Sequence, residues 1–134
     1  PLAVRLSATD WDEAGLSVED NVQMAQWLKV AGVDIVDCSG GGASPVSRSS
    51  IGNKTAMQPA IAGDIRSHSD MMTMAVGGIT DAQHAEDIIA SGQADIALLA
   101  REMMRNPNWP FLAAKTLGVD VKAVVPAHKA FFVG

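Results

Sequence analysis

Small and basic residues stand at two places in the sequence where an anion could bind. Gly77 and Gly78 follow the apolar run 71–76 and precede a helical pattern, so their backbone N–H groups could approach an anion closely. Ala100 and Arg101 occupy the same position in the next unit, where a small side chain is followed by a guanidinium. Together they predict a phosphate-binding site. A simple tight turn next to a solvated arginine is the alternative.

Another basic residue, Arg5, lies within the short apolar run 2–7. A charged side chain is costly to bury in a strand unless it is paired. Because side chains alternate across a strand, Arg5 points away from Val4 and Leu6, and in a closed barrel that direction could be the interior. An edge strand with Arg5 in water is the alternative.

Other reactive side chains give weaker signals. Cys38 lies in an apolar run beside Asp37 and has no basic neighbour in the sequence, which favours a buried structural thiol over a nucleophile. The histidines have no metal-ligand spacing, so we expect no metal site and surface positions for all three: His68, His84 and His128.

The elements that must position these residues alternate along the chain. We expect strands at 2–7, 33–39, 71–76 and 94–100. We expect helices at 17–31, 59–68, 82–90 and 109–117, a helical turn at 101–106 and a long loop at 43–58. Ser17 and Asp20 predict a capping pair, Thr80 or Asp81 is expected to cap the helix at 82, and Trp27 and Trp109 are expected to anchor packing.

Alternating strands and helices predict an α/β fold with a parallel sheet and right-handed crossovers. Two architectures fit this pattern: a small doubly wound sheet, and half of a (β/α)₈ barrel. The spacing does not separate them. In both architectures functional sites lie at the carboxyl ends of the strands, where the glycine and arginine pairs are found.

Composition limits the class of protein. The chain has 134 residues, too few for a complete (β/α)₈ barrel of about 250. Its net charge of −5 argues against a nucleic-acid-binding surface. A single cysteine and the lack of an apolar stretch of about 20 residues predict a cytoplasmic protein without an internal disulfide or a membrane span. Because it opens on Pro1, we expect a segment cut from something longer, or a processed chain.

Four stretches together resemble the C-terminal half of the Old Yellow Enzyme family, in this order and spacing: VRLSATDW, VDIVDCSGG, AVGGIT and ADIALLAREMMRNPNW. The most similar group is that of the bacterial NADPH dehydrogenases and xenobiotic reductases, and the resemblance covers residues 2–118. It implies an FMN-containing (β/α)₈ TIM barrel. Within residues 1–134, strands five to eight would lie in 1–118, and 119–134 would form an irregular tail.

The resemblance also implies cofactor-binding roles. Arg5 would contact the pyrimidine edge of the flavin near N1 and C2=O, and Ser39 would lie near the mouth of the active site. The FMN phosphate would be held after strands seven and eight, by Gly77, Gly78, Ala100 and Arg101.

This chain departs from the family at two places. Ala100 stands where the family has glycine, and because alanine resists a positive φ, we expect a slightly altered phosphate loop. Lys129 and Phe131 stand near the places of a tyrosine and an arginine that reach a neighbouring subunit in relatives, so a shared active site is not carried over.

The implied activity is that of an FMN-dependent NADPH oxidoreductase, an ene-reductase. NADPH would reduce FMN, and the reduced flavin would pass hydride to an activated C=C bond such as that of an enone. The substrate-binding and catalytic residues are expected in the first four strands, so the chain should pair with that N-terminal half or with another copy, in a homo-oligomer. The alternatives are an isolated half-barrel that binds FMN or a phosphorylated ligand without catalysis, and a related barrel with different chemistry.

Overall fold

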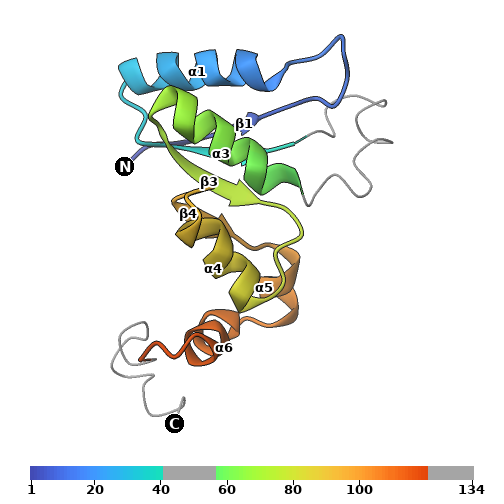
Figure 1. Cartoon of the computed structure of the whole chain (residues 1–134), viewed down its shortest axis with the longest axis vertical. Helices are drawn as coiled ribbons and strands as arrows, with labels where there is room; N and C mark the ends of the chain where they lie inside the picture. The colour runs from blue at the N-terminus through green and yellow to red at the C-terminus, as the bar shows by residue number, and fades with distance from the viewer. Residues whose placement is uncertain (41–56, 121–134) are drawn as a thin grey trace.

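A computed structural model describes residues 1–40 and 57–120 (Figure 1). Its elements are, in order, β1 (Ala3–Ser7), α1 (Val18–Val30), β2 (Ile35–Ser39), α3 (Gln58–Ser69), β3 (Met72–Val76), α4 (Ala82–Ala90), β4 (Ile96–Leu98), α5 (Arg101–Arg105) and α6 (Trp109–Thr116). These bounds confirm the predicted alternation. The largest difference is β4, which is confined to three residues within the expected run 94–100.

Several predictions fall outside the described residues. Most of the expected loop 43–58 does so, although its last residue, Gln58, already begins α3. The expected tail 119–134 is described only for its first two residues, so Lys129 and Phe131, and with them His128, lie outside.

The four strands form one parallel sheet in the sequential order β1-β2-β3-β4. The register places Arg5 opposite Asp37 on β1 and β2, and Met74 opposite Ile96 on β3 and β4. This arrangement confirms the α/β class and the pairing of the last two strands.

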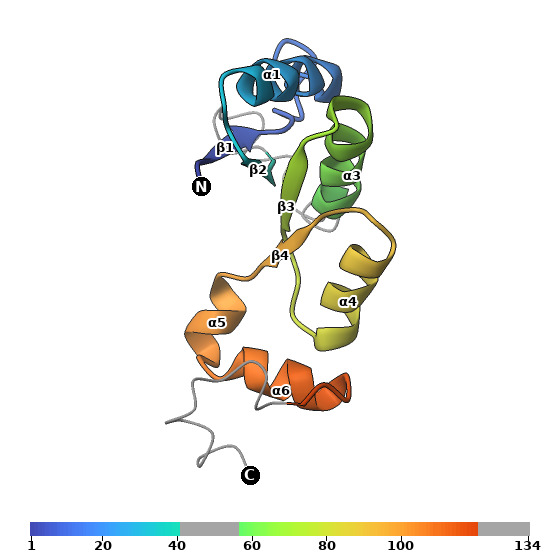
Figure 2. The same ribbon diagram turned by 90° about the vertical axis from the view of Figure 1, so that its left-hand side faces the viewer.

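Helices α1, α3 and α4 cover one side of this sheet, as Figure 2 shows for α3 and α4. The core between the two layers includes Val36, Cys38, Ile65, Ala75 and Ile88, and the side chains of alternate strand residues reach it. On the opposite face, Met72 is 52% exposed and Ile96 is 42% exposed. That face therefore carries apolar side chains that are partly open to solvent.

Local capping signals explain where two helices begin. The Ser17 hydroxyl accepts a hydrogen bond from the Asp20 backbone N–H, and the Asp20 carboxylate accepts one from the Ser17 N–H, so the predicted capping pair is confirmed. Asp81, rather than Thr80, caps α4, since its carboxylate accepts the N–H of His84 at 2.9 Å.

The two tryptophans behave differently. The prediction that Trp27 anchors packing is wrong, because its ring is 64% exposed. The buried face of α1 runs through Ala25, and a position two residues further lies about 200° around the helix. Trp109 is half-buried on α6, which packs against α4, and it does anchor an element.

A bidentate ion pair lies at the amino ends of β3 and β4, whereas the predicted site lies at their carboxyl ends. Arg66 on α3 donates from Nε to Oδ2 of Asp95 at 3.0 Å and from Nη2 to Oδ1 at 3.1 Å. Asp95 Oδ2 also accepts the N–H of Thr73 on β3 at 2.9 Å. The hydrogen bond from Arg66 is the main cause that lowers the pKa of Asp95. This carboxylate, which directly precedes β4, therefore ties α3 to β3 and to the start of β4.

None of the helices in the described part of the chain combines the length and the hydrophobicity that a membrane span requires.

Candidate functional site

The turn after β3 has a backbone that favours glycine. Gly77 has a φ of 125° and Gly78 a φ of 68°, both in the region that side-chain-bearing residues rarely adopt. Residues 76–80 of this turn and residues 98–102 after β4, together with Arg105, line a cavity of about 190 Å³. The structure thus brings Gly77, Gly78, Ala100 and Arg101 together around one cavity at the carboxyl ends of β3 and β4.

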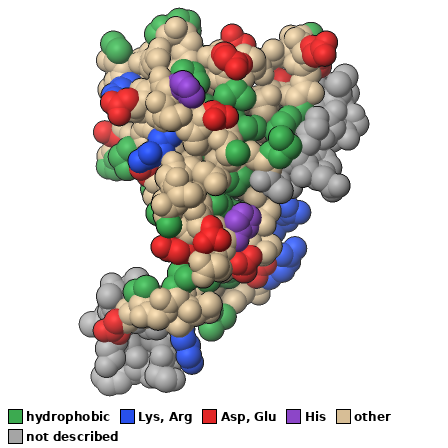
Figure 3. All heavy atoms as spheres, viewed as in Figure 1, with side chains coloured by type: hydrophobic (Ala, Val, Ile, Leu, Met, Phe, Trp, Pro, Cys, Tyr) green, Lys and Arg blue, Asp and Glu red, His purple; other side chains and the backbone are tan. Residues whose placement is uncertain are grey.

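Two arginines give this cavity its charge. Arg101 begins α5, and Arg105 follows one turn later. Arg105 donates from Nη1 to Oε2 of Glu102 at 3.0 Å, so the acidic residue at the cavity is paired. Figure 3 shows basic side chains gathered beside α5. Turn N–H groups and guanidinium groups together suit an anion such as a phosphate.

Arg105 and Glu102 were missed by the reasoning from the sequence. The signal was present, because residues four apart on a helix share a face, and Arg105 follows Arg101 at that spacing. The sequence predicts only a helical turn at 101–106, whereas the structure forms helix α5 there, with Arg101 and Arg105 both lining the cavity.

Ala100 causes no conflict in the loop after β4. Its φ is −106° and its ψ is −75°, so the position does not require the positive φ that alanine resists. The expected difference between this loop and that of relatives with glycine stays a prediction.

Arg5 is exposed and paired at the same time. Its Nε donates to Oδ2 of Asp37 at 2.6 Å, and the side chains are 64% and 11% exposed, respectively. Strand β1 is an edge of this sheet, as the alternative reading expected, but Arg5 has a carboxylate partner. Asp37 was not singled out from the sequence, although a carboxylate within an apolar strand is a signal of the same kind as Arg5.

Ser39 is the last residue of β2, at the carboxyl end of that strand. Its hydroxyl donates to the carbonyl oxygen of Leu6 at 3.1 Å, and its own carbonyl accepts the N–H of Ala8 at 2.6 Å. Ser39 thus fastens β2 to β1, and the hydroxyl oxygen keeps the capacity to accept a hydrogen bond. Ser39 and Arg5 are outside the lining of the cavity between β3 and β4.

Cys38 is buried in the core, as expected for a structural thiol. Burial raises the pKa of its thiol to about 12, and the nearby Asp37 charge adds to the shift. The thiolate that nucleophilic chemistry needs is therefore scarce at neutral pH. Of the two described histidines, His68 is exposed and His84 half-buried.

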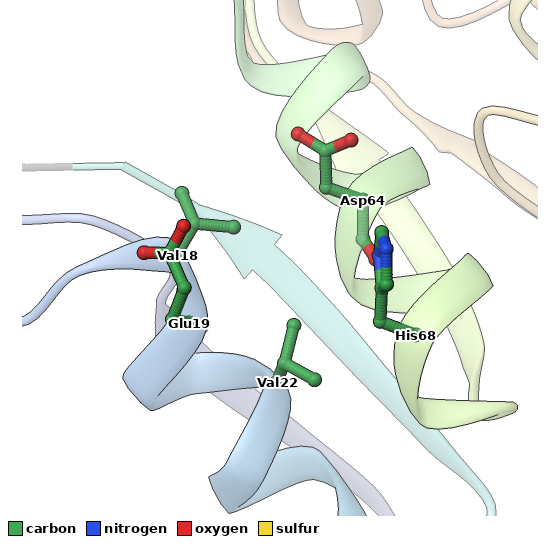
Figure 4. A pocket seen from close by; sticks show the side chains of 5 residues that line it. All are labelled: Val18, Glu19, Val22, Asp64 and His68. Atoms are coloured by element: carbon green, nitrogen blue, oxygen red, sulfur yellow. The ribbon is translucent and has the colours of Figure 1, made fainter.

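A larger cavity of about 430 Å³ lies in the helix layer, away from the predicted site. It is lined by Val18, Glu19, Val22, Asp64 and His68, which come from α1 and α3 (Figure 4). The ring of His68 is engaged by its own helix, since Nδ1 lies 2.8 Å from the Asp64 carbonyl oxygen. None of the predicted cofactor-binding residues reaches this cavity.

Comparisons with known proteins add to this geometry. The sequence model of the NADH:flavin oxidoreductase / NADH oxidase family matches residues 2–119. The chain is 43% identical over 131 residues to an NADPH dehydrogenase of Geobacillus sp. (strain WCH70), and 40% identical over 131 residues to one of Bacillus subtilis (strain 168). Both alignments cover 98% of this chain but 38% of the relative, so the chain spans well under half the length of these proteins.

Proposed function

The chain belongs to the NADH:flavin oxidoreductase / NADH oxidase family, and from that membership we propose that it forms the C-terminal half of an FMN-dependent NADPH dehydrogenase. The resemblance to the Old Yellow Enzyme family is thereby confirmed. The matched region contains every residue predicted to bind the cofactor, from Arg5 to Arg101.

The architecture of this half follows from the sheet. Its strands run in sequential order, and the helices that connect them, α1, α3 and α4, lie on one side. A doubly wound sheet reverses its strand order and carries helices on both sides. This supports strands five to eight of a (β/α)₈ barrel, with residues 1–134 as one unit. The outer edges of β1 and β4 would then pair with an N-terminal half, or with another copy of the chain in a homo-oligomer.

The cavity between β3 and β4 carries this proposal, because its donors fit the phosphate of FMN. The backbone N–H groups of the turn at Gly77 and Gly78, with the Arg101 guanidinium, would hold the phosphate oxygens. Arg5 would stand beside the pyrimidine edge of the flavin, where a fixed cation stabilises negative charge. Bound FMN supplies hydride transfer between NADPH and a second substrate.

The second substrate is proposed to be an activated alkene such as an enone. Ser39 would lie near the mouth through which it enters. The groups that hold its carbonyl oxygen are not among the residues assigned here and would come from the first four strands. The present chain would therefore bind the phosphate and, through Arg5, stabilise negative charge on the flavin, whereas the first four strands would bind the substrate.

Replacing Arg101 tests the phosphate assignment. In the intact protein, Arg101→Ala should weaken FMN binding tenfold or more, since charged hydrogen bonds contribute about 1.5–3 kcal/mol. Riboflavin lacks the phosphate, so its affinity should stay unchanged. Lys115→Ala, which removes an exposed cation on α6, is the matched control. An equal loss for FMN and riboflavin, or no loss, would rule out this assignment.

The alternative function is binding of FMN without catalysis, because the residues proposed to bind FMN all lie within this chain. If NADPH does not decrease the visible absorbance of the bound flavin, the result would support binding without catalysis. Bleaching by NADPH, followed by reoxidation with an enone, would support the dehydrogenase.

A further inference from the structure

We propose that Asp37 is a positioning residue for Arg5. Its carboxylate holds the guanidinium through Nε, so that the two terminal nitrogens remain available to the flavin edge. This inference rests on the proposed function and adds to it a residue that the cofactor itself does not touch.

The geometry of the pair is that of an anchor at one end. Arg5 and Asp37 face each other in register on β1 and β2, and Nε lies 2.6 Å from Oδ2. Within residues 1–40 and 57–120, no hydrogen bond is formed by Nη1 or Nη2 of Arg5. The Nε end of the guanidinium is therefore fixed, while Nη1 and Nη2 are available to bind a ligand.

Stability alone does not account for this pair. An ion pair with one partner 64% exposed adds little to stability, because solvent screens it. The carboxylate is mostly withdrawn from water, and its Oδ1 is buried with no hydrogen-bond partner in the described part of the chain. A site selected for stability would satisfy that oxygen or replace the pair by apolar side chains. Fixing a cation on the open face of the sheet explains the arrangement better.

In the alternative role, Asp37 acts only as a negative charge near the flavin. Its removal would then shift the reduction potential in the opposite direction. A negative charge disfavours the reduced, more negative flavin, so its removal should raise the midpoint potential. If Asp37 acts by holding Arg5, its removal lets the cation move away and lowers the potential. The sign of the shift separates the two roles.

The experiment measures the midpoint potential of the flavin bound to the intact protein. Arg5→Ala should lower it, and Asp37→Ala should lower it by at least half as much. In the double variant, Asp37→Ala should cause no further decrease beyond that of Arg5→Ala, because the residue acts through the arginine. Asp37→Asn, which keeps an acceptor oxygen, should restore the potential toward that of the unmodified protein.

Asp34→Ala is the matched control, because Asp34 is an exposed carboxylate just before the same strand and should leave the potential unchanged. If Asp37→Ala does not fold, Asp37→Leu fills the buried site and gives the same readout. A potential that rises or stays unchanged overturns the positioning role but leaves the FMN site standing. An intact protein that binds no flavin overturns both.

Discussion

Trp109 and Thr80 are joined across 29 residues by a hydrogen bond of 2.9 Å, from the indole Nε1 to the backbone carbonyl oxygen. Thr80 closes the turn that begins at Gly77 and directly precedes Asp81, the cap of α4. Helix α6 is thereby attached to the turn that lines the cavity between β3 and β4. A helix that does not itself line the cavity is thus in contact with the turn that does.

Trp109→Phe should weaken FMN binding about fivefold, because a typical hydrogen bond contributes about 1 kcal/mol and its loss loosens the turn. Fluorescence titration of the flavin-free intact protein with FMN measures this. Trp27→Phe changes an exposed ring on α1 and should leave the affinity unchanged. Equal affinities for the two variants would show that the α6 contact does not steady the turn.

Gly78→Ala should lower both stability and FMN affinity. With a φ of 68°, an added Cβ costs about 1–2 kcal/mol in this left-handed conformation. Gly92→Ala is the control, since its φ is 75° and the nearest atom to its new Cβ is Arg66 Nη1 at 3.9 Å, away from the cavity. Both variants should unfold more readily, and titration with FMN should show a loss only for Gly78→Ala. Unchanged affinity in Gly78→Ala would contradict the phosphate assignment of this turn.

The Asp95 carboxylate should make stability depend on acid pH. Its pKa is lowered in the folded protein, first by the hydrogen bond from Arg66, so the unfolded chain binds more protons near pH 4. The contribution is complete above the unfolded pKa of about 3.9 and is lost as the pH falls through the lower folded value. Thermal unfolding of the intact protein across this range should show a steeper loss of stability than in Asp95→Asn.

Asp70→Asn is the matched control for this pH effect. Asp70 pairs with Lys29 at the end of α3, but its side chain is 98% exposed, so solvent screens the pair. Its removal should change stability much less than Asp95→Asn does. Equal effects would mean that the ion pair of Arg66 and Asp95 contributes no more to stability than a surface ion pair does.

Cys38 should resist alkylation in the folded protein. Burial raises its pKa to about 12, so little thiolate exists at pH 8, and the sulfur is out of reach of the reagent. Peptide mapping after treatment with iodoacetamide should find Cys38 unmodified in the native protein and modified after denaturation. Rapid native labelling would show that the β2 core opens readily.

Much of the fold was determined by the sequence alone, because its signals are local. Alternating apolar runs and helical patterns predicted the parallel sheet, and Ser17 with Asp20 predicted the start of α1. The glycine pair at 77–78 predicted that the chain turns after the third strand, and the structure has a turn there, with a positive φ at both glycines. The phosphate role of that turn, and the flavin contact of Arg5, remain predictions carried by the family resemblance.

Only the tertiary structure decided which distant side chains meet. Asp37 faces Arg5 across 32 residues because core packing sets the register between β1 and β2, and no local pattern encodes that register. The exposure of Trp27 was decided by which face of α1 the core buries. Short-range preferences determine where strands, turns and caps form, whereas the pairing of charges depends on how the finished elements pack together.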